Sequence, residues 1–166
     1  MPDLVRRVIL DGVPMYAEAE AEDLKAHYAP VIEPDINGVH LILAHNFCRD
    51  QILFWPWYER SAQAARRAGL PSPRDLHEWV LEVLKGLGGF PLGYRAVFGY
   101  PMAARLPAVR QPTLCVSAAA DTLAEASRRA AALLPDGDLV LIRDTGEAMA
   151  PPADVAAAIL TFLATA

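Results

Sequence analysis

The chain has 166 residues, a formal net charge of −5 and 54% apolar residues, a length that suits one domain with one core. Ample apolar residues beside only 21% charged ones exclude a disordered chain. The acidic balance, without a basic stripe, argues against a nucleic-acid partner, and no run of about 18 apolar residues predicts a membrane span. The start does not resemble a signal peptide, and the two cysteines are far apart, so we expect a cytoplasmic protein with free thiols.

Three short apolar runs predict β-strands, each apolar enough to lie in a parallel sheet that is covered on both faces. They are residues 4–10, 113–117 and 139–142. Helices are expected after the second and third runs, over 122–134 and 154–164. The order strand, helix, strand, helix is typical of a right-handed β-α-β unit. The sequence therefore predicts an α/β fold with about three parallel strands.

Residues 13–106 differ in kind and predict a helical insertion. Helices are expected over 18–28, over 37–67 with an interruption at Pro56, over 73–87, and over 94–106 with a break at Pro101. We expect this insertion to form a cap on a sheet built from residues 1–12 and 107–166. The whole chain, 1–166, is then a single domain.

The predicted strands lie in segments with characteristic sequences. Val5–Gly12 is VRRVILDG, Pro112–Asp121 is PTLCVSAAAD, and Leu139–Leu163 joins a strand to a helix that ends in ILTFL. These segments resemble the C-terminal half of an α/β hydrolase, where the first leads into a helical cap and the second carries the acid of the catalytic triad. Gly38–Tyr58 also resembles caps of that superfamily. The resemblance implies a truncated α/β-hydrolase fold with Asp121 at the place of the acid.

Two parts of that family's catalytic machinery do not occur in this sequence. The family's nucleophile lies on a G-x-S-x-G turn before the first strand found here, and the sequence has no such motif. Thr145-Gly146-Glu147-Ala148 stands where a Gly-His pair is expected. A serine needs a base, and the tetrahedral intermediate needs oxyanion donors, so the usual mechanism is not open to this chain alone. Glu147 is either an exposed loop acid or a base in place of the histidine.

The cap suggests a different nucleophile. On a helix with about 100° per residue, His45 and Cys48 fall on one stripe, where their side chains could meet. An imidazolium would lower the thiol pKa and so activate Cys48, and Asp50 could orient the imidazole. The alternative is that Cys48 is a small core residue and that His45 lies in the core or at a dimer interface.

Asp121 has two possible roles. It follows the second predicted strand, and ligand clefts of open α/β sheets lie outside that end of the strands. It would serve there as a catalytic acid, or simply cap the helix that begins at Thr122. His40, His45 and Asp50 lie on different sides of one helix, so we expect no metal site. We also expect no cofactor.

These observations leave three hypotheses of function. The first is a small hydrolase of activated carboxyl or phosphotriester-like esters, with Cys48 as nucleophile, His45 as base and Asp121 as acid, and with the apolar part of the ester in a pocket formed by the cap and the sheet edge. The second is a non-catalytic remnant that dimerises or binds an apolar ligand. The third is one half of a split hydrolase. The first is our working hypothesis.

The truncation has a consequence for assembly. Without the strands that precede it in the family, the first strand would be an unpaired edge, and such edges pair with other chains. We therefore expect a homodimer. The two copies would pair through residues Val5–Leu10 across a two-fold axis, or pack through the cap around Trp55 and Trp57.

Overall fold

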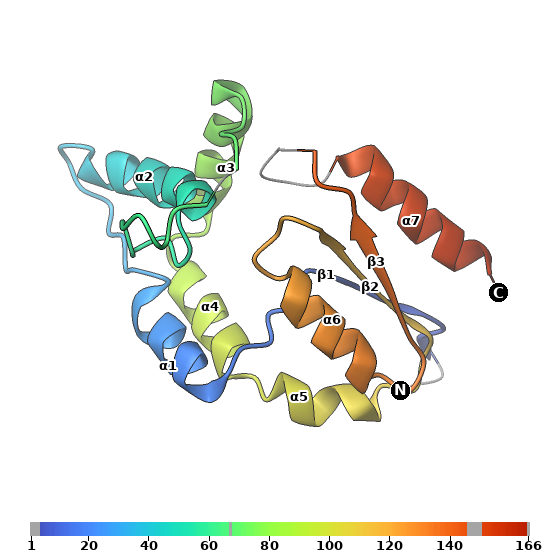
Figure 1. The fold of residues 1–166 in the computed structure, drawn as a ribbon. Coiled ribbons are helices and arrows are strands. Elements are labelled where there is room, and N and C mark those ends of the chain that lie inside the picture. Colours follow the sequence, from blue (N-terminus) through green and yellow to red (C-terminus); the bar gives the residue numbers. More distant parts are fainter. Residues whose placement is uncertain (1–3, 67, 146–150, 166) are drawn as a thin grey trace. The chain divides into compact units, whose positions relative to one another are not determined.

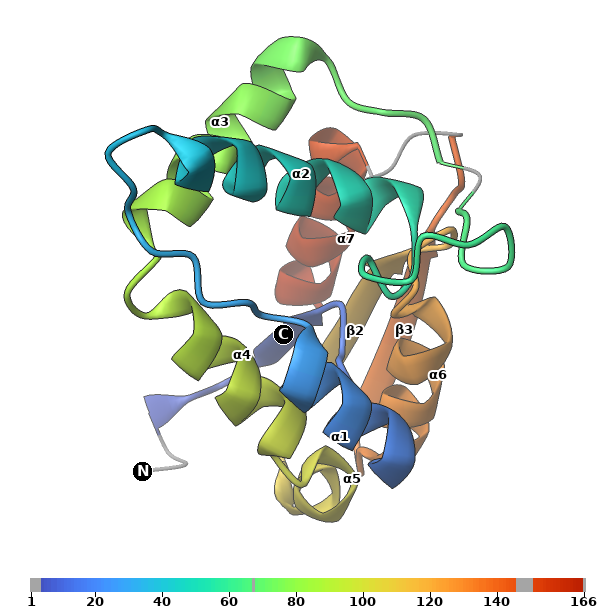
Figure 2. The same cartoon turned by 90° about the vertical axis from the view of Figure 1, so that its left-hand side faces the viewer.

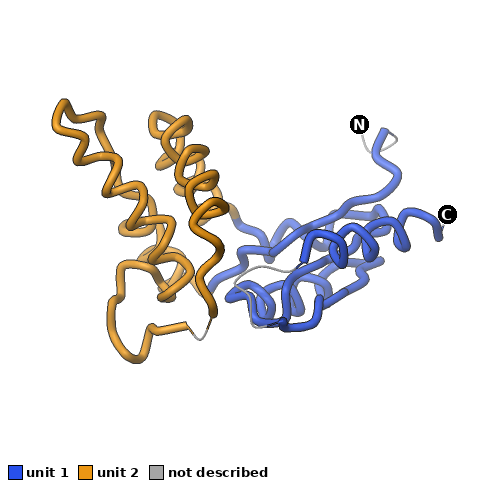
Figure 3. The backbone as a smooth tube through the Cα atoms, turned by 90° about the horizontal axis from the view of Figure 1, so that it is seen from above, with its two compact units in different colours: residues 1–16, 101–145, 149–166 blue, residues 17–100, 146–148 orange. Residues whose placement is uncertain are grey.

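The computed structural model describes residues 4–66, 68–145 and 151–165, and the chain divides into two compact units (Figure 3). Unit 1 comprises residues 1–16, 101–145 and 149–166, and unit 2 comprises residues 17–100 and 146–148. The main boundaries, after Tyr16 and Tyr100, lie close to those predicted between the sheet and its insertion. That the two units together form a single domain stays a prediction.

Unit 1 contains one sheet of three parallel strands in the order β1-β2-β3 (Figure 1). The strands are β1 (Val8–Asp11), β2 (Thr113–Ala118) and β3 (Gly137–Ile142). The predicted α/β class and the three parallel strands are confirmed. The first strand is shorter than expected, because its pairing register begins with Val8 beside Thr113, where β2 itself begins.

The middle strand supplies side chains to two cores, because successive residues of a strand point to opposite faces of the sheet. Cys115 packs toward α6 (Ala124–Leu133). Leu114 and Val116 pack with Phe162 of α7 (Pro152–Ala164) on the other face. The two helices that follow β2 and β3 thus cover the sheet, as the β-α-β pattern predicts.

Unit 2 is helical, with α1 packed against α4 and α2 against α3 (Figure 2). Its helices are α1 (Glu18–His27), α2 (Val39–Leu53), α3 (Pro73–Lys85) and α4 (Phe90–Gly99). The short helix α5 (Met102–Arg105) and a 3-10 turn (Leu106–Ala108) lead back to β2 in unit 1. In the described part of the chain, no helix combines the length and the apolar character needed to cross a membrane.

The helix ends of unit 2 follow from proline and from capping. The helix expected over 37–67 ends at Leu53, and Phe54 is already extended two residues before Pro56, whose ring and missing N–H disfavour a helix interior. At the start of α3, the hydroxyl oxygen of Ser72 accepts a hydrogen bond from the Asp75 N–H at 3.2 Å, as serine commonly does at the N-cap of a helix. Pro91 does not break a helix, since it lies in the first turn of α4, where proline is tolerated.

Candidate functional site

Aromatic side chains form one cluster in unit 2, centred on Tyr28. The ring of Tyr28 lies 4.9 Å from Tyr94, 5.3 Å from Phe98, 5.7 Å from Trp55 and 6.2 Å from Phe47, centroid to centroid. Such pairs add about 0.5–1.5 kcal/mol each beyond the area that they bury. The cluster therefore joins α1, α2 and α4 to the irregular segment that follows α2.

A shallow groove of about 430 Å³ opens on the helices beside this cluster, with mostly apolar walls. It is lined by Phe47, Gln51, Trp79, Glu82, Val83, Gly86, Gly89, Phe90 and Tyr94. Two of these are glycines at the turn between α3 and α4, and a Cβ atom placed on Gly89 would meet no atom of the described chain within 4 Å. The groove exists partly because Gly86 and Gly89 of this turn carry no side chains.

Polar groups of the groove are few, and those of Gln51 and Glu82 are already engaged. The Gln51 side-chain carbonyl accepts a hydrogen bond from the Tyr28 hydroxyl at 2.8 Å. The carboxylate of Glu82 forms an ion pair with Lys85 at 2.6 Å. Of the described residues that line the groove, none is a lysine or an arginine. The site thus offers apolar surface and no cation of its own.

Cys48 lies wholly buried on α2. Burial raises the pKa of its thiol to about 11, because a low-dielectric surrounding disfavours the thiolate. Burial also raises the pKa of the Tyr94 phenol, and the charge that a Cys48 thiolate would carry nearby raises it further. At neutral pH the thiol stays protonated, and the thiolate is the nucleophilic form.

His45 and Cys48 lie at different depths on α2, since the His45 side chain is exposed and Cys48 is not. Within the part of the chain that the structure describes, no hydrogen bond or ion pair joins them. The pKa of the thiol moves upward, mainly because of burial, and not downward as an adjacent imidazolium would move it; the roles of Cys48 as nucleophile and His45 as base stay a prediction. The geometry fits the alternative, a small core cysteine.

Asp50 does not orient His45; it holds two arginines. Its carboxylate is 1% exposed, with Arg49 Nη2 2.7 Å from Oδ1 and Arg60 Nη2 2.8 Å from Oδ2. The contact with Arg60 is an ion pair rather than a well-directed hydrogen bond. A buried carboxylate needs such partners, and the contacts fix the segment after α2 to the helix.

Asp121 lies in unit 1, between the end of β2 and the start of α6. Its Oδ1 accepts a hydrogen bond from the Leu123 N–H at 2.7 Å and a longer one from the Thr122 hydroxyl at 3.4 Å. This contact closes a local turn ahead of α6, which begins at Ala124 rather than at Thr122 and whose N-cap residue, Leu123, has no side-chain cap. Its role as a catalytic acid stays a prediction, and Glu147 lies outside the described residues.

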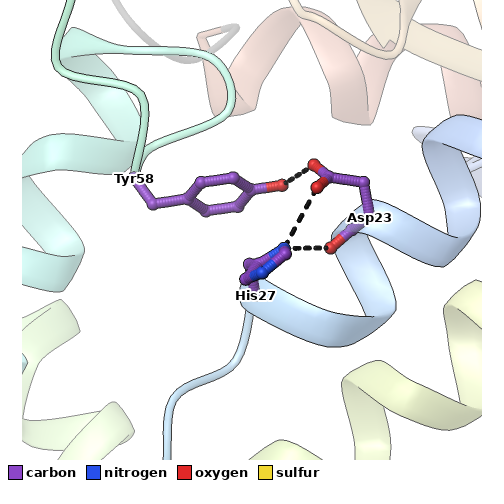
Figure 4. Close-up of polar contacts among 3 residues, drawn as sticks. All are labelled: Asp23, His27 and Tyr58. Carbon is purple, nitrogen blue, oxygen red and sulfur yellow. Dashed lines mark hydrogen bonds and ion pairs between the residues drawn. The ribbon is translucent and has the colours of Figure 1, made fainter.

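A third polar cluster, absent from the sequence-based expectations, joins α1 to the segment after α2 (Figure 4). The Tyr58 hydroxyl donates to Asp23 Oδ2 at 2.5 Å, and His27 Nδ1 lies 3.0 Å from both Oδ1 and the carbonyl oxygen of Asp23. Burial raises the pKa of Tyr58, and the hydrogen bond to Asp23 raises it further. Asp23 and His27 lie four residues apart on a helix, a spacing that could have indicated their contact. The contact between Tyr58 and Asp23 spans 35 residues, so no local sequence pattern indicates it.

Within the described part of unit 2, Cys48 and His45 do not form a hydrogen-bonded or ion-paired couple, and the predicted acid lies in the other unit. Cys48 and His45 belong to unit 2 and Asp121 to unit 1. Within the described ranges there is also no group of three or more His, Cys, Asp or Glu side chains that could hold a metal ion.

Comparison with known proteins shows a likeness of fold. No known protein family matches the sequence, and no curated protein matches it significantly. The structure is similar to the crystal structure of an alpha/beta hydrolase from Sphaerobacter thermophilus DSM 20745, with a TM-score of 0.50 and 17% sequence identity. The match covers 96% of this chain and 58% of that one. The protein therefore has an α/β fold like that of an α/β hydrolase, and it spans little more than half of such a chain.

The burial of Cys48 predicts slow thiol chemistry. In a Cys115→Ala variant, where Cys48 is the one remaining thiol, we expect disulfide exchange with 5,5′-dithiobis(2-nitrobenzoate) at about pH 8 to be at least about a hundredfold slower in the folded protein than in urea. The thiolate fraction falls by roughly that factor when a thiol pKa rises from about 8.5 to about 11. Equal rates in the two states would show an accessible, ionised thiol and contradict the assignment of Cys48 to the core.

Proposed function

We propose that the groove of unit 2 binds a neutral, apolar small molecule of the aryl or acyl ester class. The observation that carries the proposal is its lining: Phe47, Trp79, Phe90 and Tyr94 border a groove of about 430 Å³ with mostly apolar walls. Small-molecule sites are typically concave and apolar, with a few polar groups that set orientation. An ester has an apolar body and no charge, so it matches this chemistry.

The charges around the groove favour a neutral ligand over an anion. Glu82 is the one charged residue among the described lining residues and is already paired with Lys85, so no cation of the lining is available to pair with an anionic ligand. Desolvating an unpaired carboxylate is unfavourable. A carboxylic acid should therefore bind less tightly than an uncharged molecule of the same shape.

Ester hydrolysis is the second candidate function, favoured by the position of Asp121 directly after the middle strand of a hydrolase-like fold. In this hypothesis Asp121 is the acid of a split hydrolase, and another polypeptide supplies the nucleophile and its base. The buried, protonated Cys48 thiol argues for the binding function over a hydrolase built on Cys48 and His45.

The binding proposal has a matched pair of variants. Gly89 lines the groove and Gly88 does not, and a Cβ atom on either would meet no atom of the described chain within 4 Å. A leucine at position 89 should fill the groove without strain. In calorimetric titrations with 2-naphthol we expect wild-type binding of roughly millimolar affinity or tighter. Gly89→Leu should weaken it at least about tenfold, and Gly88→Leu should leave it unchanged.

The charge argument is tested in the same titrations with 2-naphthoate, which keeps the bicyclic ring and adds a carboxylate. We expect it to bind more weakly than 2-naphthol. Equal binding of 2-naphthol by the two leucine variants, or no saturable binding by the wild-type chain, would contradict the proposal.

Hydrolysis of a panel of p-nitrophenyl esters separates the catalytic hypotheses. Because Cys48 is protonated and apart from His45, we expect the wild-type chain, Cys48→Ala and His45→Ala to show the same rate, at the level of uncatalysed background. Loss of turnover in both variants, with their circular dichroism unchanged, would instead support the Cys48–His45 nucleophile.

A further inference from the structure

The outer edge of β1 is arranged to accept another strand. β1 pairs with β2 alone among the described strands. On that inner side, the N–H of Val8 donates to the Pro112 carbonyl at 3.0 Å, and the N–H of Gly12 donates to the Val116 carbonyl at 2.8 Å. Backbone groups of alternate residues point to opposite sides of a strand. The odd-numbered residues of β1 therefore point their N–H and C=O groups outward.

The side chains along this edge are apolar in the middle and oppositely charged at the ends. Val8, Ile9 and Leu10 are half-buried, and Asp11 is exposed. Arg7 precedes them at the start of the strand. The edge thus has a short apolar centre between a cation and an anion.

Arg7 is held in place by α7. Its guanidinium stacks over the ring of Phe162, 4.8 Å from the centroid, and its Nη1 donates to the Thr165 hydroxyl at 3.3 Å. Arg7 directly precedes β1 and Asp11 is the last residue of β1, four residues further on, so in an extended chain their side chains point to the same face of the sheet. The two unlike charges are therefore presented at fixed positions on one face.

We propose that this edge binds a second copy of the chain, with the two β1 strands antiparallel about a two-fold axis at Ile9. In an antiparallel pair, the side chains of directly opposite residues lie on the same face of the sheet. The two-fold axis must therefore pass through a residue and not between two residues. With the axis at Ile9, Arg7 of each copy faces Asp11 of the other, and Val8 faces Leu10. The outward backbone groups of Arg7, Ile9 and Asp11 then form the hydrogen-bonded pairs.

The neighbouring registers are less favourable. An axis at Val8 places Asp11 opposite Val5 and Arg7 opposite Ile9, and an axis at Leu10 places Asp11 opposite Ile9. An axis at Arg7 places two arginines opposite each other, which destabilises a strand pair. Charge complementarity therefore selects Ile9, and the pairing joins the two sheets into one.

Charge reversal tests the register. We expect sedimentation equilibrium of the wild-type chain, from about 1 to about 200 μM, to show a monomer–dimer equilibrium. Arg7→Glu and Asp11→Arg should each raise the dimer dissociation constant at least about tenfold, because each places like charges opposite one another twice per dimer. The double variant Arg7→Glu/Asp11→Arg should restore dimerisation, because it exchanges the two charges.

Arg6→Glu is the control for net charge. Its side chain points to the other face and, in this register, lies opposite Gly12, so it should leave the dissociation constant unchanged. Asp11→Arg keeps the test independent of the contacts that Arg7 makes with α7, and circular dichroism verifies that each variant is folded. A monomer at all concentrations, or a double variant no stronger than the single ones, would overturn the proposal.

Discussion

The pairing of β2 on both sides is the constraint on which unit 1 depends. Because β2 lies between β1 and β3, its side chains from Thr113 to Ser117 are buried, and their alternation supplies both cores. The same pairing fixes where the strand ends, and with it the place of Asp121 at the start of α6. In unit 2 the rings packed around Tyr28 have the corresponding role, and the groove lies beside them. Asp121 thus lies next to β2 in unit 1, and the groove lies next to the aromatic cluster in unit 2.

Sequence predicts the elements of this fold well where the signal is local. The cap at Ser72 and the end of the helix before Pro56 depend only on residues a few positions away in the sequence, so the local sequence indicates them. The length of β1 was overestimated because a strand also needs a partner, and the register with β2 begins only at Val8. Because β2 is far away in the sequence, the residues before Val8 do not indicate where the pairing begins.

The candidate site was less predictable because the polar and apolar residues of α2 are spread around the helix instead of forming two faces. Phe47 and Cys48 are buried, whereas Ile42 and Leu43 on the same helix are 64% and 48% exposed. A helix without a polar face gives no indication of which side packs inward. The spacing that set His45 beside Cys48 was sound, but the depth of each residue depends on the helices packed against α2. The groove has the same origin, since it needs side chains from three helices and two glycines from the turn between them.

The central claim, that a neutral apolar ligand binds in the groove of unit 2, is tested most directly by methyl nuclear magnetic resonance during a titration with 2-naphthol. Val83 lines the groove, and Val116 lies in the core of unit 1. The proposal predicts saturable shifts of the Val83 methyl resonances, caused by the ring current of the ligand, with the Val116 resonances unchanged. Shifts confined to Val116 and its neighbours, or no saturable shift of Val83, would contradict it.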